Sequence, residues 1–350
     1  MLFRTGNKVL TSKNKGMNYK TFIGVDISKK TIDVAVKFNG QQQIQHCQFV
    51  NDQKGFKAMM GWLKQMTGKE QSECIFCMEH TGVYVLPLAC FLSDNQLSFC
   101  LENPYHIKHS MGLQRGKTDK ADAKMIARYA AMHQEELRLS SFPGKTIIKL
   151  QALLAYRDRL VNTQKGLKVA SNELSGFVEK QISSHIQKET KSLVKCIENR
   201  IKKADLQIEE LLKQDTDIYK NYTLAKSVKG VGTIIAAHMI VYTQNFTTIT
   251  DSRKFASYSG IAPFEYSSGT SLNKGPSVSH LANKKMKRLL NNGAWNAARY
   301  DNEIKIYFQR KVAEGKNQLS VINAVRNKIV GRVFAVVKRG TPYVSIVNYN

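Results

Sequence analysis

The sequence predicts an α/β domain in its first third and a mainly helical remainder. Two apolar runs, residues 22–25 and 74–78, each stop on a carboxylate, at Asp26 and Glu79. Around them, stretches with strand and helix periodicity alternate as far as residue 132. After Pro143-Gly144 the pattern changes to long amphipathic helices. We therefore expect an α/β part that ends at residue 142 and an α part that follows it.

Three strands open the α/β part. Residues 22–26 form a mostly apolar strand, and residues 32–38 alternate apolar and polar side chains with the period of two of a half-buried strand. Asn39-Gly40 is a hairpin-type turn, after which residues 44–50 return as a third strand. Asn51-Asp52 then caps a helix over residues 53–66.

Alternating helices and strands complete this part. A buried strand over residues 74–78 precedes a helix over residues 83–92, a short strand near residues 97–101, helical residues around Ile107 and a helix that begins at Asp119. Three antiparallel strands followed by alternating elements is the order of the RNase H fold. We therefore expect an RNase H-like domain over residues 19–142. The basic residues 1–18, with Met17 as a candidate native start, are expected to be a tail.

Residues 143–222 have the pattern of long paired helices. Leucines recur every seven residues, at Leu153, Leu160, Leu167 and Leu174. Over residues 197–211, apolar residues recur at intervals of three and four residues. This spacing predicts a coiled coil, formed within the chain or between chains. The intervening positions of the first helix are polar: Arg157, Gln164 and Ser171. A helical spacer and a dimerisation arm both remain open.

Residues 223–350 form a third, mainly α part, with helical residues to Lys338. Its stretch SVKGVGT resembles the turn of a helix-hairpin-helix, in which small residues let backbone N–H groups approach a phosphate. An ordinary tight turn is the alternative. A Ser/Gly-rich loop over residues 266–275 and a basic helix from Lys284 follow. The residues expected to bind nucleic acid are Lys117, Lys120, Lys229, Gly230, Gly232, Lys284, Lys285, Lys287 and Arg288.

The charge of the chain indicates its partners. Fifty-three Lys and Arg residues against 27 Asp and Glu give a formal net charge of +26, which attracts polyanions. Nucleic acid is the leading candidate, and no apolar run approaches the ~20 residues that span a bilayer. Cys74 and Cys77 lie three apart on a strand and so on opposite faces, which favours core cysteines over a zinc or redox pair. This composition fits a reducing cytoplasm.

Four acids from three distant segments stand at the ends of elements: Asp26, Glu79, Asp119 and Asp122. Reactive groups gather beyond the carboxyl ends of parallel strands, and acids at i and i+3 share one face of a helix. Converging carboxylates repel one another unless cations lie between them, and oxygen ligands select Mg²⁺ or Mn²⁺. Taken singly, Asp119 is a helix cap and Asp26 a turn residue. The set, however, predicts a divalent-metal site for phosphodiester displacement.

Several motifs resemble one known family. GVDISKKTIDV, MEHTGVY, ENP and GKTDKADAKMIARYA are similar to the DEDD transposases of insertion-sequence family one-hundred-ten, the bridge-RNA-guided recombinases related to Piv-type invertases. SVKGVG, FASYSGIAPFEYSSGTSLNKG and VVKRGTPY follow the family's order, so the resemblance covers residues 19–343. It implies a RuvC-like domain whose metal-binding tetrad is the four acids. It also implies a C-terminal transposase domain whose nucleophile is Ser268. The neighbouring Ser267 ranks well below Ser268 as a candidate.

The resemblance further implies a mechanism and partners. Ser268 would attack a DNA phosphate and form a covalent phosphoserine, assisted by metals held by the acids of another protomer. The implied partners are donor and target DNA, a structured non-coding guide RNA and further copies of the chain as a dimer or tetramer, at the bacterial nucleoid. The chain departs from the family at His280 and Ala282, where a lysine and a glycine are usual, while Lys287 and Arg288 keep the basic pair.

Alternatives to this function stay open. One is a site-specific invertase of the same family, and another is a RuvC-like Holliday-junction nuclease that uses water. A third is a nucleic-acid-binding scaffold without catalysis. Tyr105, Tyr266 and Trp295 can stack on bases, but we expect core packing for each.

Overall fold

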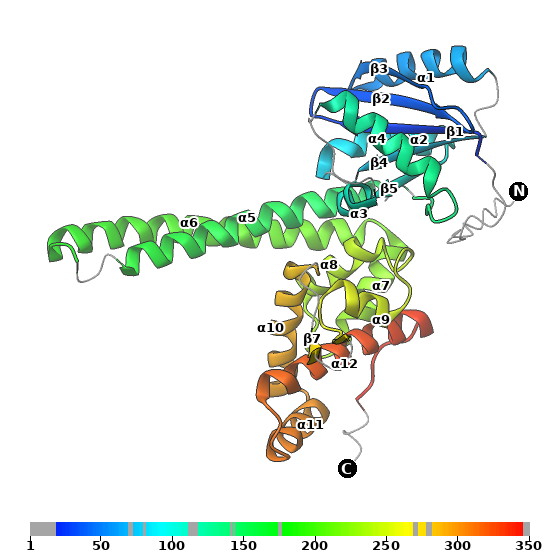
Figure 1. The fold of residues 1–350 in the computed structure, drawn as a ribbon. Helices are drawn as coiled ribbons and strands as arrows, with labels where there is room; N and C mark the ends of the chain where they lie inside the picture. Colours follow the sequence, from blue (N-terminus) through cyan, green and yellow to red (C-terminus); the bar gives the residue numbers. More distant parts are fainter. Residues whose placement is uncertain are drawn as a thin grey trace, which may run out of the picture. The chain divides into compact units, whose positions relative to one another are not determined.

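The computed structural model describes residues 19–68, 73–79, 82–110, 118–140, 142, 144–173, 177–268, 272–277 and 282–345. The predicted tail, residues 1–18, lies outside the described residues. The chain divides into two compact units, Met1–Phe142 and Pro143–Asn350 (Figure 1). No helix of the described ranges is both long and apolar enough to cross a lipid bilayer.

The first unit contains a mixed five-stranded sheet in the order β3-β2-β1-β4-β5. Its strands are β1 (Thr21–Ile27), β2 (Thr31–Phe38), β3 (Ile44–Val50), β4 (Cys74–Glu79) and β5 (Phe99–Glu102). β1, β2 and β3 pair antiparallel, whereas β4 is parallel to both β1 and β5. The three antiparallel strands, followed by alternating helices and strands, confirm the predicted order of elements, and this sheet fits an RNase H-like domain.

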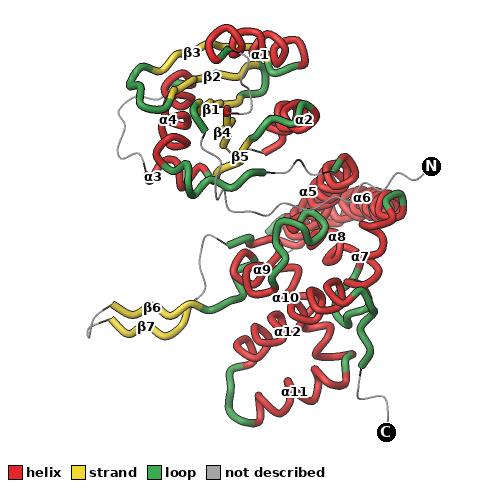
Figure 2. Tube along the Cα trace, turned by 90° about the vertical axis from the view of Figure 1, so that its right-hand side faces the viewer, coloured by secondary structure: helices red, strands yellow, loops and turns green. Residues whose placement is uncertain are grey.

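Helices cover both faces of this sheet (Figure 2). On one face, α1 (Gln53–Thr67) and α2 (Leu86–Asp94) bury Phe56, Met59 and Leu88 against Ile23 and Val25 of β1. On the other face, α3 (Pro104–Ser110) and α4 (Asp119–Met132) contribute Ile107, Met125 and Ile126 to a second core, which includes Phe22 and Cys77. Cys74 belongs to the first core and Cys77 to the second, so the two lie on opposite faces as predicted.

Local signals explain the helix starts. Asp52 caps α1, because its side chain accepts from the backbone N–H of Gly55, as the sequence predicts. The helix expected over residues 83–92 is instead a 3₁₀ turn (Gly82–Val85) followed by α2. Pro87 accounts for this difference, because proline is tolerated only in the first turn of an α-helix.

The second unit is mostly helical. Its helices are α5 (Lys145–Glu173), α6 (Lys180–Lys213), α7 (Thr216–Lys226), α8 (Thr233–Thr243), α9 (Ser252–Tyr258), α10 (Lys284–Tyr300), α11 (Asn302–Ala313) and α12 (Gln318–Arg339). One core joins Leu150 and Leu154 of α5 to Ile208 of α6, Leu290 of α10 and Val333 of α12. The base of the α5–α6 pair therefore shares its core with the C-terminal helices.

Helices α5 and α6 lie side by side and antiparallel (Figure 1). Two of the polar positions on α5 face acids on α6. Arg157 pairs with Asp205, and Gln164 donates to Glu198 at 2.8 Å. The polar residues that interrupt the leucine repeat thus form hydrogen bonds between these two helices.

The Ser/Gly-rich stretch expected to be a loop contains two strands. β6 (Phe264–Ser268) and β7 (Leu272–Ser277) pair antiparallel, with Ser268 opposite Leu272. The expectation of a loop throughout was wrong. Phe264 and Tyr266 have the aromatic side chains that favour strands, and this preference outweighs the small residues around them.

Candidate active site

Asp26 and Glu79 stand beside each other at the ends of two parallel strands. The β1–β4 register runs as far as Val25 opposite Met78, and the two acids are the next residues on each strand. Both side chains are half-buried. Because side chains alternate along a strand, both acids lie on the sheet face that α4 covers, two residues beyond Gly24 and Cys77.

Helix α4 brings the other two acids to this edge. Thr118 caps the helix by accepting from the N–H of Ala121, and Asp119 and Asp122 occupy the first turn. Gly24 on β1 allows the helix to approach closely. A Cβ atom at Gly24 would lie 2.2 Å from the backbone N of Ala127 and 2.3 Å from the carbonyl O of Ala123. The absence of a side chain at this position therefore fixes where the first turn of α4 lies.

The electrostatics of Asp26 reflect this arrangement. Burial, followed in decreasing order by the carboxylates of Asp122, Asp119 and Glu79, raises the pKa of Asp26 to about 6. Acids from β1, β4 and α4 thus repel one another within one region. Such repulsion is relieved by a bound cation.

Two more acids extend this group along the sheet. Asp33 of β2 is paired directly with Asp26, and Glu102 of β5 is paired with Glu79. Asp33 is buried and accepts from His46 at 2.7 Å and from Gln48 at 2.9 Å. The sequence reasoning missed both acids. The short connection between β1 and β2 could have identified Asp33, because a tight hairpin fixes which residues are opposite.

The chemistry of these donors fits a hard divalent cation, because each offers carboxylate oxygens. Among the described residues, no three His, Cys, Asp or Glu side chains form a ready-made metal cage. Asp26, Glu79, Asp119 and Asp122 therefore stay the predicted ligands of such an ion.

Ser268, the predicted nucleophile, is the last residue of β6. Hydrogen bonds close the base of the β6–β7 hairpin. The side chain of Asn283 donates to the Tyr258 hydroxyl at 2.8 Å, and its backbone N–H donates to the Tyr258 carbonyl, also at 2.8 Å. On the entry side, Asn323 and Asn327 of α12 donate to the carbonyl of Ile261 at 2.9 and 3.1 Å. The segment that contains the hairpin therefore leaves the helical core near Ile261 and rejoins it at Asn283.

Comparison with known proteins identifies the family. Residues 23–174 match the DEDD transposases of IS110 type, described as "Transposase", and residues 222–309 match the "Transposase IS116/IS110/IS902 family". The chain belongs to the IS110 family of transposases. It is thus a DNA recombinase, and the DEDD domain of this family implies dependence on a divalent metal.

Individual relatives of this transposase are similar to it in sequence. The "Pilin gene-inverting protein" of Moraxella bovis is 27% identical over 329 residues, which are 93% of this chain and 98% of that protein. Its counterpart in Moraxella lacunata gives the same values. The "Insertion element IS110 uncharacterized 43.6 kDa protein" of Streptomyces coelicolor is 30% identical over 119 residues, 34% of this chain and 29% of that protein.

A polar cluster of one buried and two half-buried side chains lies behind the start of α10 in the transposase. Lys285 forms an ion pair with Asp158 of α5, and His238 of α8 lies 3.9 Å from the same carboxylate. Burial lowers the pKa of His238 to about 4, although Asp158 opposes this shift. The neutral imidazole stacks on Tyr242, with ring centroids 5.5 Å apart. This cluster was not predicted, and it holds α10 against α5 and α8.

The residues expected to bind nucleic acid fall into three places. Lys120 is exposed in the first turn of α4, and Lys117 lies outside the described residues. Lys229, Gly230 and Gly232 form the connection between α7 and α8, where Gly230 has a φ of +89°. On α10, Lys284 and Arg288 are exposed and Lys287 is half-buried. Lys285 forms an ion pair with Asp158.

Proposed function

We propose that this IS110-family transposase cuts and rejoins DNA through Ser268, with Asp26, Glu79, Asp119 and Asp122 holding Mg²⁺ or Mn²⁺. The gathering of these acids at one edge of the sheet carries the proposal, because burial and their mutual repulsion raise the pKa of Asp26, and a bound cation would relieve that repulsion. The serine and the acids would meet at one scissile phosphate, with the acids supplied by another protomer. The bound metal would stabilise the charge of the pentacovalent phosphate.

The reaction conserves the phosphodiester bond energy. The Ser268 hydroxyl attacks phosphorus, the Oγ–P bond forms, and the bond to one deoxyribose oxygen breaks. The serine proton ends on that departing oxygen. In the reverse direction a deoxyribose hydroxyl of another strand attacks the phosphoserine, so that strands are exchanged rather than hydrolysed. An unactivated serine is a poor nucleophile, which is why the acids and their metal are needed.

The proposed partners follow from the net charge of the chain, from the turn between α7 and α8 and from the α5–α6 helix pair. A net charge of +26 suits donor and target DNA together with a structured guide RNA, whose phosphates attract Lys and Arg. The turn between α7 and α8 would approach a phosphate as a helix-hairpin-helix does. The α5–α6 pair would act as a coiled-coil arm that joins copies of the chain into a dimer or tetramer.

The first experiment traps the covalent intermediate. Wild-type protein incubated with cognate DNA and Mg²⁺ is denatured, and protein-linked DNA is measured by gel shift. Ser268→Ala should abolish the adduct and recombination, whereas Ser267→Ala, its neighbour on β6, should retain both. An adduct that persists in Ser268→Ala would refute the role of this serine. Cleavage without any adduct would support a water-using nuclease instead. Strand exchange that survives both Asp26→Asn and chelation would refute the metal site.

A site-specific invertase is the second candidate. Its support is that the Moraxella relatives, aligned over nearly the whole chain, are named for inverting a pilin gene. A plasmid with two recognition sites in inverted orientation separates the two outcomes. Inversion of the intervening segment without insertion elsewhere would favour the invertase, and insertion at an unlinked target would favour the transposase.

A further inference from the structure

The C-terminal half of α10 has an exposed face. A hollow of about 630 Å³ is lined by five residues of this helix: Asn292, Trp295, Asn296, Arg299 and Tyr300. Tyr300 is 74% exposed, and Asn292, Asn296 and Arg299 are exposed as well. Because three and four residues approximate one helical turn, these side chains form a continuous stripe.

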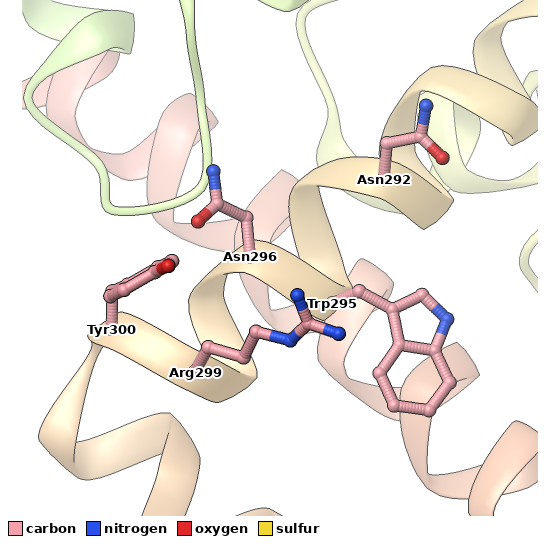
Figure 3. Close-up of a pocket in the computed structure, with 5 residues that line it drawn as sticks. All are labelled: Asn292, Trp295, Asn296, Arg299 and Tyr300. Carbon is pink, nitrogen blue, oxygen red and sulfur yellow. The ribbon is translucent and has the colours of Figure 1, made fainter.

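The stripe combines aromatic rings, amides and cations. Figure 3 shows Trp295 and Tyr300 at its two sides, with the Arg299 guanidinium and the Asn296 amide between them. Trp295 is half-buried and contacts Phe308 edge-on, with the ring centroids 5.8 Å apart. The Phe308 ring therefore covers only part of the indole of Trp295. The predicted core packing of Trp295 therefore describes only one side of its ring.

The charge around the stripe favours a phosphate-bearing ligand. Helix α10 contains no Asp or Glu, and its exposed cations Lys284, Arg288 and Arg299 follow the same side of the helix. A second hollow of about 440 Å³ continues from Asn292 and Asn296 to Gly230 and Thr233. Asp205 and Glu209 also line this second hollow. Arg157 is paired with Asp205, and Lys226 lies 3.9 Å from Glu209, which offsets their charge.

We propose that this face of α10 binds an unpaired nucleotide, with its base stacked on Tyr300 and within quenching range of Trp295, its edge hydrogen-bonded by Asn292 and Asn296, and its phosphate paired with Arg299. A paired base hides its faces in the duplex, whereas an unpaired base exposes them to aromatic rings. An asparagine amide carries both donors and an acceptor, which match the edges of a base. The proposal rests on the proposed function, because it assigns part of the nucleic-acid surface of the transposase.

The chain contains a local probe for this site. It has two tryptophans, Trp62 in α1 and Trp295, so Trp62→Phe in the full-length chain leaves Trp295 as the sole reporter. Titration with short single-stranded RNA and DNA oligonucleotides should quench Trp295 emission to saturation. A blunt duplex of the same length should not. Unequal quenching by the RNA and the DNA identifies which strand the face prefers, and equal quenching means that it accepts both.

Variants test the individual contacts. Tyr300→Ala should weaken the quenching transition by roughly 5- to 150-fold, the range for loss of one stacked base, and Tyr300→Phe should keep wild-type affinity. Tyr219→Ala removes an aromatic residue of α7 that is 40% exposed, and it serves as the control. Tyr300 is exposed, so its removal leaves the fold intact. Quenching that is equal in Tyr300→Ala and Tyr300→Phe would overturn the proposal, as would quenching by the duplex.

The same titration is followed by the anisotropy of a labelled oligonucleotide, which reports binding anywhere on the chain. Binding by anisotropy with no change in Trp295 emission would refute the site on α10 and leave the proposed function standing. Absence of any binding at low salt would refute the nucleic-acid partner itself. If instead Tyr300→Ala changed the sedimentation coefficient and not the quenching, the face would be a contact between copies of the chain, and the proposal would be wrong.

Discussion

At the scale of single residues, Asp26 has the most informative environment. It lies where two parallel strands end, under the first turn of α4, and next to Asp33 on the neighbouring strand. Its pKa of about 6 exceeds the ordinary value of 3.8, so the folded chain holds this proton more tightly than the unfolded chain does. Without a divalent cation, deprotonation of Asp26 therefore destabilises the fold.

This pKa predicts a pH-dependent difference in stability. The free energy of unfolding of the first unit should fall as pH rises from about 4 to about 6. Asp26→Asn carries no charge and should lack this fall, so it should be more stable than wild type at pH 7. The difference should shrink at pH 4. Urea unfolding followed by Trp62 fluorescence in a Trp295→Phe background measures it.

Two controls accompany this measurement. Glu135→Gln removes an exposed acid of the same unit and should change stability equally at both pH values. Mg²⁺ should stabilise wild type more than Asp26→Asn at pH 7, because a ligand bound only by the folded state adds to its stability. Equal stabilisation of both proteins by Mg²⁺ would show that Asp26 does not hold the ion.

At the scale of elements, the contact of α4 with β1 sets the geometry of the acids. Gly24→Ala should lower the free energy of unfolding by about 1–3 kcal/mol, because its Cβ would overlap the α4 backbone. It should also weaken the stabilisation by Mg²⁺, because Asp119 and Asp122 move with the helix. Gly61→Ala in α1, where an added Cβ meets nothing within 4 Å, should instead stabilise by up to about 1 kcal/mol. Equal effects of the two substitutions would contradict this account.

The base of the serine hairpin allows a second prediction at this scale. Asn283 caps α10 through Met286 and bonds Tyr258. Asn283→Ala should lose about 1 kcal/mol of unfolding free energy with the cap, whereas Asn283→Ser keeps a capping oxygen and loses less. Both substitutions remove the hydrogen bond from the Asn283 side chain to the Tyr258 hydroxyl, and Tyr258→Phe removes the same bond. If Ser268 is the nucleophile, all three should slow adduct formation. Wild-type rates in Asn283→Ser would show that capping alone matters.

Some of these elements follow from local sequence signals, whereas other features depend on contacts between distant segments. Strand β3 and the Asp52 cap were predicted correctly, because a hairpin turn and a helix cap are local signals. The tight approach of α4 at Gly24 depends on a tertiary contact, which no local pattern encodes, whereas the pairing of Asp33 with Asp26 follows from the short β1–β2 hairpin. The cluster around His238 also depends on tertiary contacts, because its members come from three helices. The four acids remain predicted metal ligands, and the sequence singles them out because each stands at the end of a recognisable element.

At the scale of the whole molecule, the α5–α6 pair exposes apolar side chains. Val169, Ile182 and Leu193 are 44%, 49% and 55% exposed. Leu193→Lys should reduce self-association, because a lysine cannot be buried unpaired between chains. Ser184→Lys adds the same charge at another exposed position of α6 and is the control. Sedimentation velocity measures the change, and an unchanged sedimentation coefficient for Leu193→Lys would exclude this part of α6 from the contact.

The closed base of the β6–β7 hairpin has a consequence for the segment that it encloses. Tyr258 and Asn283 are joined to each other, and Ile261 is held by α12, so the helical core does not depend on what is inserted between them. A change in the length of the segment between Ile261 and Asn283 should therefore leave these hydrogen bonds in place. The distance to which the segment extends from the helical core could then change independently of that core.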